Sequence, residues 1–260
     1  MNVDLSRALA VAERAARAAG QLMRQNWRRP KKVNAMTAHD IKLDLDVRCQ
    51  QRIEKQLRRA FPGISLLGEE GASGAADAAW RWVVDPIDGT VNFAYGIPHA
   101  CVSIALQQRE PAGAYATRLG VIYDPFTDEI WTATQNGPAR LNGRRIQVSP
   151  RRQLRECIVC VGFAKSRHSL QRALPDFIRM ARRVRKMRMM GAAALGLAYV
   201  ASGRFDAYLE RGVSLWDVAA GGLIVERAGG KFWTQTIPGR RQIRMVASNG
   251  LVHAQLPRPR

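Results

Sequence analysis

The segment Trp82-Val83-Val84-Asp85-Pro86-Ile87-Asp88-Gly89-Thr90-Val91-Asn92-Phe93 joins a run of apolar residues to a turn that carries two carboxylates. The apolar residues predict a buried strand, and Pro86, which has no N–H to donate, should end the hydrogen bonding of that strand. The turn that follows would let Asp85 and Asp88 converge on one point and leave the carbonyl of Ile87 available as a further oxygen ligand. Taken alone, the segment reads equally well as an ordinary Asp-Pro turn followed by an Asp-Gly pair.

Gly89 and Thr90 suit the same turn to an anion. Because Gly89 has no side chain, a phosphate could approach its backbone closely. If a helix starts at this point, the backbone amides of Gly89 and Thr90 would point toward that phosphate. The segment therefore offers oxygen ligands for cations and amide donors for an anion within a few residues.

Two other acidic segments favour a metal site over an ordinary turn. Gly68-Glu69-Glu70 precedes the first segment, and Leu215-Trp216-Asp217 follows it far downstream. Mg²⁺ prefers oxygen ligands and usually takes only one or two carboxylates per ion, so several ions need several carboxylates. Carboxylates at three remote points of the chain therefore predict a phosphatase site that holds more than one metal ion.

These segments, with Asn92-Phe93 and the stretch from Glu226 to Gly230, resemble the motifs of the inositol monophosphatase family of Mg²⁺-dependent, lithium-sensitive sugar phosphatases. The similarity extends roughly from residue 5 to residue 250, and the motifs occur in the family's order and spacing. The resemblance implies an α/β fold, the five-layer αβαβα sandwich of this phosphatase superfamily. It also implies two or three Mg²⁺ ions, a small phosphorylated polyol as substrate, and a homodimer.

The resemblance implies roles for individual residues. The positions that match the family's metal ligands are Glu69, Asp85, the carbonyl of Ile87, Asp88 and Asp217. Asp46 and Thr90 match the pair thought to position and deprotonate the attacking water, and Glu70 would support the ligands by hydrogen bonding or through a water molecule. The mechanism implied is an in-line displacement by a metal-activated water, without a phosphoenzyme.

Asp46 has a competitor within its own motif. It lies in Leu43-Asp44-Leu45-Asp46, where Asp44 is equally acidic, and Asp46 is preferred because it stands 23 residues before Glu69, which is the family spacing. Both residues precede or open a predicted helix, so either could instead be an N-cap. The sequence leaves these alternatives open.

The polyol side of the site departs from the family pattern. Many members have Ser or Thr after the glycine of this motif, whereas this chain reads Gly191-Ala192-Ala193-Ala194, so a substrate-contacting hydroxyl is absent at Ala192. Glu210 matches a carboxylate that accepts hydrogen bonds from sugar hydroxyls, and an exposed Glu beside Arg211 is the alternative. The expected substrate contacts are Asp88, Gly89, Thr90, Gly191, Ala192, Ala193 and Glu210. Inositol 1-phosphate is the first candidate substrate, with histidinol phosphate, fructose 1,6-bisphosphate and nucleotide 3′-phosphate as alternatives.

Length and composition indicate a single domain over residues 1–260. The chain has 260 residues, of which 47% are hydrophobic, and no Pro/Gly/Ser-rich linker separates two closely packed halves at about 1–150 and 151–260. It has no apolar stretch of about 18 residues and no apolar block near its start, so we expect a soluble, cytoplasmic protein that does not enter a membrane. Cys157 and Cys160 lie on a predicted strand and should point to opposite faces, which favours buried structural thiols over a metal or redox pair.

Hydrophobic periodicity predicts alternating helices and strands. Long amphipathic helices are expected over 4–27 and 44–60. Strands are expected over 65–67, 81–84, 102–107, 119–123, 129–134 and 158–162, with a last strand near 243–248. Further helices are expected over 168–183, 191–202 and 216–228.

The charge of the chain has three explanations. Lys and Arg number 41 against 21 Asp and Glu, a net charge of +20, and the acids used as metal ligands leave the rest of the surface still more basic. The positive field could steer anionic substrate, or it could contact RNA or the transcription machinery, as bacterial relatives of the family are known to do. A basic surface without a partner is the third reading, because no aromatic residues lie among the basic clusters. One such cluster, from Arg179 to Arg188, is expected on a helix.

Overall fold

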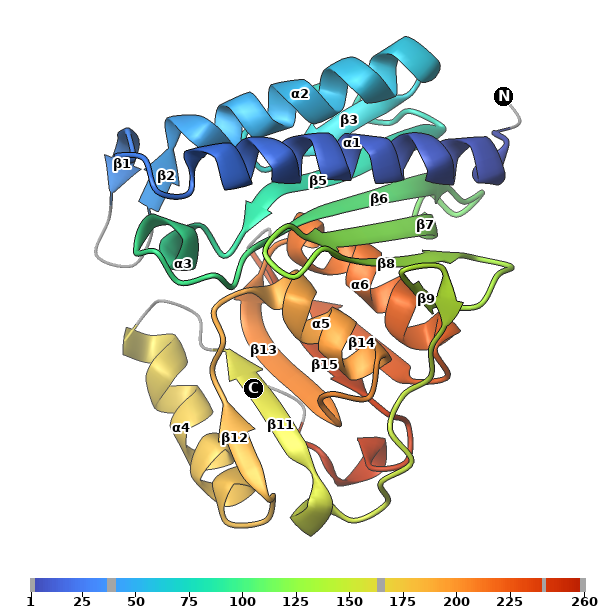
Figure 1. Ribbon diagram of the computed structural model, residues 1–260. Helices are drawn as coiled ribbons and strands as arrows, with labels where there is room; N and C mark the ends of the chain where they lie inside the picture. The colour runs from blue at the N-terminus through green and yellow to red at the C-terminus, as the bar shows by residue number, and fades with distance from the viewer. Residues whose placement is uncertain (1–2, 37–40, 163–166, 240–241, 258–260) are drawn as a thin grey trace.

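Two long helices, α1 (Leu5–Asn26) and α2 (Asp44–Ala60), form the outer layer of the protein (Figure 1). The computed structural model describes residues 3–36, 41–162, 167–239 and 242–257. α1 begins where the carboxylate of Asp4 accepts hydrogen bonds from the backbone N–H groups of Ser6 and Arg7, at 2.9 and 3.2 Å. Both helices bury one apolar face, as their periodicity predicts.

The outer helices cover an eight-stranded sheet with the strand order β10-β9-β8-β7-β6-β5-β3-β4. β3 and β5 are parallel, and the other neighbours are antiparallel. The strands are β3 (Ser65–Gly68), β4 (Gly71–Ser73), β5 (Trp80–Asp88), β6 (Cys101–Arg109), β7 (Tyr115–Asp124), β8 (Glu129–Thr134), β9 (Arg140–Leu141) and β10 (Arg144–Arg145). The short helix α3 (Thr90–Ala94) follows β5 directly, and β1 (Val33–Met36) pairs with β2 (Ile41–Leu43) beside it.

On the other face of this sheet lie helices α5 (Ala193–Ala201) and α6 (Leu215–Arg227), and beneath them a five-stranded sheet (Figure 1). Its strand order is β12-β11-β13-β15-β14. The strands are β11 (Ile158–Gly162), β12 (Lys186–Arg188), β13 (Ala207–Val213), β14 (Lys231–Thr236) and β15 (Ile243–Ser248). Helix α4 (Arg167–Ala181) covers the far face of this sheet through Phe177 and Met180. The order of layers is therefore α/β/α/β/α, and the expected fold is confirmed.

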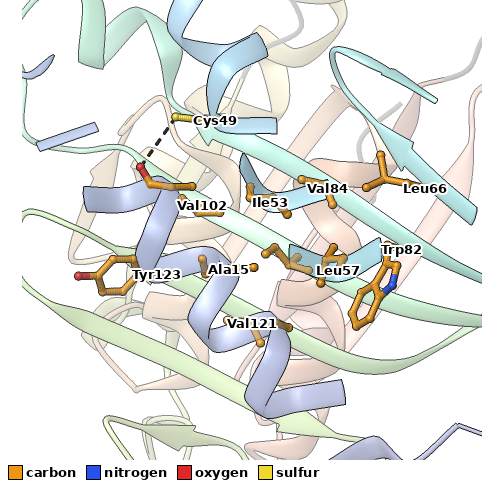
Figure 2. Packing of buried hydrophobic residues seen from close by; sticks show 14 of the residues in the cluster. Ala15, Cys49, Ile53, Leu57, Leu66, Trp82, Val84, Val102, Val121 and Tyr123 are labelled. Atoms are coloured by element: carbon orange, nitrogen blue, oxygen red, sulfur yellow. Dashed lines mark hydrogen bonds between the residues drawn. The ribbon is translucent and has the colours of Figure 1, made fainter. Parts of the chain in front are cut away.

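Three apolar clusters hold the layers together. The first, between the outer helices and the eight-stranded sheet, packs Ile53 and Leu57 of α2 against Trp82 and Val84 of β5 (Figure 2). The thiol of Cys49 donates to the carbonyl of Ala19 at 3.8 Å within it. The second cluster surrounds α5 and α6, and the third lies under α4. Each fully buried Leu, Ile or Phe contributes about 1.5–3 kcal/mol, so the clusters supply most of the favourable free energy of folding.

A glycine on β7 permits the close approach of α6. A Cβ built on Gly120 would lie 2.6 Å from the carbonyl oxygen of Ala220, which is closer than real Cβ atoms come. The backbone of α6 therefore rests directly on the backbone of β7. This contact seats the helix that carries Asp217 under the eight-stranded sheet.

The predicted helices and strands are all found, with ends shifted by a few residues. The prediction that Pro86 ends its strand is wrong, because β5 continues to Asp88 through an irregularity in its pairing. The prediction of a basic helix is also wrong in part, since α4 ends at Ala181 and the basic residues after it lie in a turn and on β12. Cys157 and Cys160 are buried in different clusters on opposite faces of the sheet, as predicted. Of the helices that the structure describes, none is long and apolar enough to cross a membrane.

Candidate metal and phosphate site

The end of β5 brings Asp85 and Asp88 to the same face of the sheet. Asp85 pairs with Ser103 and Asp88 pairs with Cys101, so β5 has one more residue than β6 between the two pairs. In a regular strand, residues three apart point to opposite faces, but the extra residue of this bulge restores the alternation. Both carboxylates therefore point toward the layer of α5 and α6. The backbone N–H of Ile87 donates to Asp85 at 3.0 Å and stabilises the turn.

Asp88 caps helix α5 across 105 residues of sequence. Its two carboxylate oxygens accept hydrogen bonds from the backbone N–H groups of Ala193 at 3.0 Å and Ala194 at 2.7 Å. The thiol of Cys101 lies 3.6 Å from the same carboxylate. The negative charge at the helix N-terminus is stabilised by these donors, and the helix is held against the end of β5.

Asp217 reaches the site from the first turn of α6. Its carboxylate accepts a hydrogen bond from the backbone N–H of Ser214 at 2.7 Å. The hydroxyl of Ser103 on β6 donates to the carbonyl of Trp216 at 3.2 Å and joins α6 to the sheet. Two helix N-termini from the second half of the chain thus meet the end of β5.

Glu69 and Glu70 occupy the turn between β3 and β4. The backbone N–H of Glu69 donates to the carbonyl of Val84 at 3.1 Å, which sets Glu69 beside the end of β5. The carboxylate of Glu70 lies 3.4 Å from the ammonium group of Lys42. The side chain of Gln50 on α2 contacts this turn as well, and Gln50 was not among the residues that the sequence singled out.

Asp46, and not Asp44, faces the site. Asp46 is buried, and its carboxylate accepts hydrogen bonds from the backbone N–H of Leu43 at 2.8 Å and from the hydroxyl of Thr90 at 3.3 Å. The Thr90 hydroxyl also lies 2.8 Å from the carbonyl oxygen of Ile87. Asp44 is half-buried and pairs with Arg48 at 3.8 Å. Leu43 is the N-cap residue of α2, so neither aspartate is the N-cap, although Asp46 hydrogen-bonds the N-cap backbone.

The carboxylates raise one another's pKa values. Burial raises the pKa of Asp85 well above its usual range, and the charges of Glu69, Asp88, Asp217 and Asp46 raise it further. Burial raises the pKa of Asp46 to about 7, with smaller contributions from Glu69 and Glu70. Burial also raises the pKa of Asp88 to about 6, against the hydrogen bonds from α5 that lower it. This concentration of negative charge is unfavourable unless cations or protons neutralise it.

The residues at this site fit a hard divalent cation. All the donors are carboxylate or carbonyl oxygens, the ligand type that Mg²⁺ prefers. Among the described residues, no three Asp, Glu, His or Cys side chains form a cluster that would enclose one ion. A Mg²⁺ ion needs only one or two carboxylates, because water and substrate phosphate complete its coordination, so ions shared among Glu69, Asp85 and Asp217 agree with this arrangement.

The polyol side of the site is built around Gly191, whose φ of 76° lies in the left-handed region. Asn92 holds this segment, since its amide donates to the carbonyls of His99 at 2.9 Å and Met190 at 2.8 Å. A Cβ built on Gly89, which has a φ of 88°, would lie 3.1 Å from the Cβ of Ala192, so the two segments touch. Gly89 precedes α3 as the sequence suggested, and Asn92 is a contact whose role the motif alone did not reveal.

Several of the expected substrate contacts already have protein partners, and Ala193 and Glu210 are among them. The backbone N–H of Ala193 donates to Asp88, and Glu210 accepts a hydrogen bond from the hydroxyl of Tyr208. Glu210 stands on β13, close enough that its charge raises the pKa of Asp88. The structure therefore brings Glu210 to the site, while the substrate contacts of both residues stay predictions.

Comparison with known proteins agrees with this geometry. A sequence profile described as the inositol monophosphatase family matches residues 4–256. The Nus factor SuhB of Pseudomonas aeruginosa is 40% identical over 233 residues, which cover 85% of this chain and 83% of that protein. The inositol-1-monophosphatase of Rhizobium meliloti is 40% identical over 199 residues, which cover 75% and 71% of the two chains. The crystal structure of the extragenic suppressor protein suhB from Bartonella henselae superposes with a TM-score of 0.87 at 33% identity and covers 95% of this chain and 96% of that one.

Proposed function

The chain belongs to the inositol monophosphatase family, and from this we propose that it is a Mg²⁺-dependent phosphomonoesterase that acts on a small phosphorylated polyol. The observation that carries the proposal is the group of carboxylates around Asp85, each of which raises the pKa of Asp85. A protein that only binds partners has no use for such a cluster, because the charges repel one another unless cations lie among them.

The metal ions would be held by Glu69, Asp85, the carbonyl of Ile87, Asp88 and Asp217. When bound, two or three Mg²⁺ ions would lower the pKa of a water molecule and neutralise charge on the phosphate and the leaving oxygen. Lithium and excess Mg²⁺ should inhibit the enzyme if one of these sites is weak, as in the family that the sequence resembles.

Asp46 and Thr90 would orient the attacking water and take up its proton. The Thr90 hydroxyl donates toward Asp46, so its oxygen lone pairs can accept a hydrogen bond from a water molecule. Asp46, whose pKa is raised to about 7, can accept a proton near neutral pH. Glu70 would support the pair from the adjacent turn, since its charge also raises the pKa of Asp46.

The substrate would place its phosphate near Asp88, Gly89 and Thr90 and its polyol near Gly191, Ala192, Ala193 and Glu210. A carboxylate such as Glu210 suits hydroxyl groups that donate hydrogen bonds. The missing hydroxyl at Ala192 weakens the case for one particular polyol, and inositol 1-phosphate stands first because a 40% identical relative is named inositol-1-monophosphatase.

The test is phosphate release from a panel of phosphomonoesters with Mg²⁺ and with EDTA. The panel contains inositol 1-phosphate, histidinol phosphate, fructose 1,6-bisphosphate and a nucleotide 3′-phosphate. We expect Mg²⁺-dependent release, fastest with one polyol phosphate. Absence of release from every member, or equal release in EDTA, would exclude the proposed activity.

We propose a second role in contact with RNA or the transcription machinery, which would be exercised in the cytoplasm. Several relatives, including one that is 40% identical, are named Nus factor SuhB, and the net charge of +20 exceeds what a small substrate requires. The two roles are compatible, because the causes of the raised pKa of Asp85 are burial and other carboxylates and include no basic side chain. We also propose a homodimer, to be tested by light scattering coupled to gel filtration.

A further inference from the structure

A basic groove lies between the two outer helices. It has a volume of about 480 Å³ and is lined by Ala18, Gln21, Leu22 and Gln25 of α1 and by Arg48, Arg52 and Lys55 of α2. α1 and α2 lie side by side along the outside of the molecule (Figure 1). We name this surface the α1–α2 groove. Its two walls lie some thirty residues apart in sequence, so the basic clusters visible in the sequence did not reveal it.

The charge of the α1–α2 groove is poorly compensated. Arg48 has a carboxylate partner, Asp44, only at 3.8 Å, and both side chains are partly exposed to solvent, which screens the pair. Within the described part of the chain, no ion pair involves Arg52 or Lys55. The facing wall adds the amides of Gln21 and Gln25, which can donate hydrogen bonds to anionic oxygens. The groove is therefore a concave surface of cations and neutral donors.

We propose that the α1–α2 groove binds the phosphate backbone of a nucleic-acid strand. Arg48, Arg52 and Lys55 follow one ridge of α2, and seven helical residues span about 10 Å, enough for two consecutive phosphates. Aromatic side chains that could stack on bases do not line the groove, so binding should depend strongly on salt and little on base sequence. This inference rests on the second proposed role and is independent of the phosphatase activity.

The experiment compares two double variants that remove equal charge. Arg52→Gln with Lys55→Gln changes the groove, and Arg182→Gln with Arg183→Gln changes the exposed turn after α4. Binding of a fluorescently labelled single-stranded oligonucleotide is measured by anisotropy between about 50 and 200 mM KCl. We expect the groove variant to bind about tenfold more weakly and the slope of log K against log salt to fall by about 1.4, the loss of two phosphate contacts on a single strand. The control variant should change less than twofold.

Three outcomes would overturn the inference. The parent could fail to bind more tightly than about 100 μM at low salt, the control variant could lose as much affinity as the groove variant, or the groove variant could bind as the parent does. Circular dichroism verifies that both variants are folded. Phosphate release from the panel is measured on the same samples and should be unchanged, so failure of the groove and failure of the phosphatase proposal are distinguishable.

A second inference concerns Gln50, which is buried on α2 four residues after Asp46. Its side-chain oxygen accepts a hydrogen bond from the backbone N–H of Glu70 at 3.0 Å, and its side-chain nitrogen donates to the carbonyl of Gly71 at 3.1 Å. A Cβ built on Gly68 would lie 2.1 Å from the Gln50 oxygen. The side-chain amide of Gln50 thus holds the turn that carries Glu69, and a glycine at position 68 is required for that contact.

We infer that Gln50 is a positioning residue for the carboxylate of Glu69. Residues four apart lie on one face of a helix, so α2 presents Asp46 to Thr90 and Gln50 to the β3–β4 turn together. Without the amide, the backbone groups of Glu70 and Gly71 lose their partners and the turn can shift away from the end of β5. Groups that orient metal ligands typically affect metal affinity by about 10–100-fold. This inference rests on the proposed metal site.

The test measures Mg²⁺ binding by calorimetry without substrate, alongside turnover. Gln50→Met keeps the length of the side chain and removes both hydrogen bonds. Gly68→Ala keeps the glutamine at position 50, but the added methyl group pushes its side-chain amide away from the turn. Both should weaken Mg²⁺ binding by about tenfold and raise the Mg²⁺ concentration for half-maximal rate more than they lower kcat. Gln51→Met, on the exposed neighbouring position, is the control and should change neither. Parent-like Mg²⁺ affinity in folded Gln50→Met would overturn the inference, whether or not the enzyme turns over the panel substrates.

Discussion

Asp85 and Asp88 stand at the same turn, yet the fold uses their charges differently. Asp85 accepts one backbone hydrogen bond and sits among four other acidic side chains that raise its pKa. Both carboxylate oxygens of Asp88 accept hydrogen bonds from backbone N–H groups at the N-terminus of α5. Without metal, the charges of both residues are therefore unfavourable, but the hydrogen bonds from α5 partly offset the cost of the charge on Asp88.

The first prediction contrasts Asp85→Asn with Asp88→Asn. Both should reduce Mg²⁺-dependent phosphate release by more than about 100-fold, because each removes the charge of a proposed metal ligand. In EDTA at pH 8, Asp85→Asn should raise the melting temperature, since the amide keeps the acceptor for Ile87 and removes repulsion. Asp88→Asn should raise the melting temperature less than Asp85→Asn does, because the relief of repulsion is offset by the loss of a hydrogen bond where one N–H of α5 would face the amide nitrogen. Calorimetry that gives the reverse order would contradict the assignment.

The second prediction concerns Thr90, whose hydroxyl lies between Asp46 and the carbonyl of Ile87. Thr90→Val keeps the shape and removes the hydroxyl, so kcat should fall by about 10²–10⁴-fold. The Thr90 hydrogen bond lowers the pKa of Asp46, so the acidic limb of the pH–rate profile should also move to higher pH. Thr90→Ser should retain most of the rate, and Asp44→Asn should be unaffected. Equal losses in Asp44→Asn and Asp46→Asn would show that the wrong aspartate has been chosen.

At the scale of elements, periodicity predicted α1, α2 and the apolar strands because each repeats one kind of side chain at a fixed spacing. It missed β13, the central strand that carries Glu210. The apolar pattern of this strand is interrupted by Glu210, Arg211 and Gly212. It also missed the bulge in β5, since an extra residue is defined only by the partner strand. The site residues were recognisable from their motifs, but the link from Asp88 to α5 and the amide of Gln50 are tertiary contacts that no local pattern encodes.

The third prediction tests how α6 is seated. Gly120→Ala inserts a methyl group where the Ala220 carbonyl oxygen lies 2.6 Å away, between two backbones that cannot both stay in place. We expect a loss of about 1–3 kcal/mol in the free energy of unfolding. We also expect weaker Mg²⁺ binding, because α6 carries Asp217. Urea unfolding and calorimetric Mg²⁺ titration measure the two effects, and a destabilised variant with parent-like Mg²⁺ affinity would separate α6 packing from the site.

For the whole molecule, the raised pKa values couple stability to pH. Asp46 and Asp88 have pKa values of about 7 and 6 in the fold, against about 4 in an unfolded chain, so the folded state holds their protons more tightly. Their contribution to stability is fully present below about pH 4 and is lost as the pH rises through about 6 to 7. The ionised carboxylates of the site should therefore lower the free energy of unfolding of the metal-free protein at neutral pH.

The fourth prediction follows from this loss of stability with rising pH. In EDTA, the free energy of unfolding should fall between about pH 5 and pH 8, and it should fall less in Asp46→Asn, which has no proton to lose there. Added Mg²⁺ should remove most of the dependence in the parent. Urea denaturation at several pH values measures both, with one cooperative transition expected because α5 and α6 pack against both sheets. Identical pH profiles for parent and variant would contradict the pKa of Asp46.

The bond from Asp88 to the start of α5 also bears on when the proposed site can assemble during synthesis of the protein. A ribosome releases the acidic turn of β5 more than a hundred residues before the amides that cap it, and Asp217 emerges later still. Since chains leave the ribosome at about 5–20 residues per second, several seconds separate the synthesis of the β5 turn from that of the α5 amides. A nascent chain shorter than about residue 217 would lack Asp217 of the proposed ligand set, so the proposed activity would require the last part of the polypeptide.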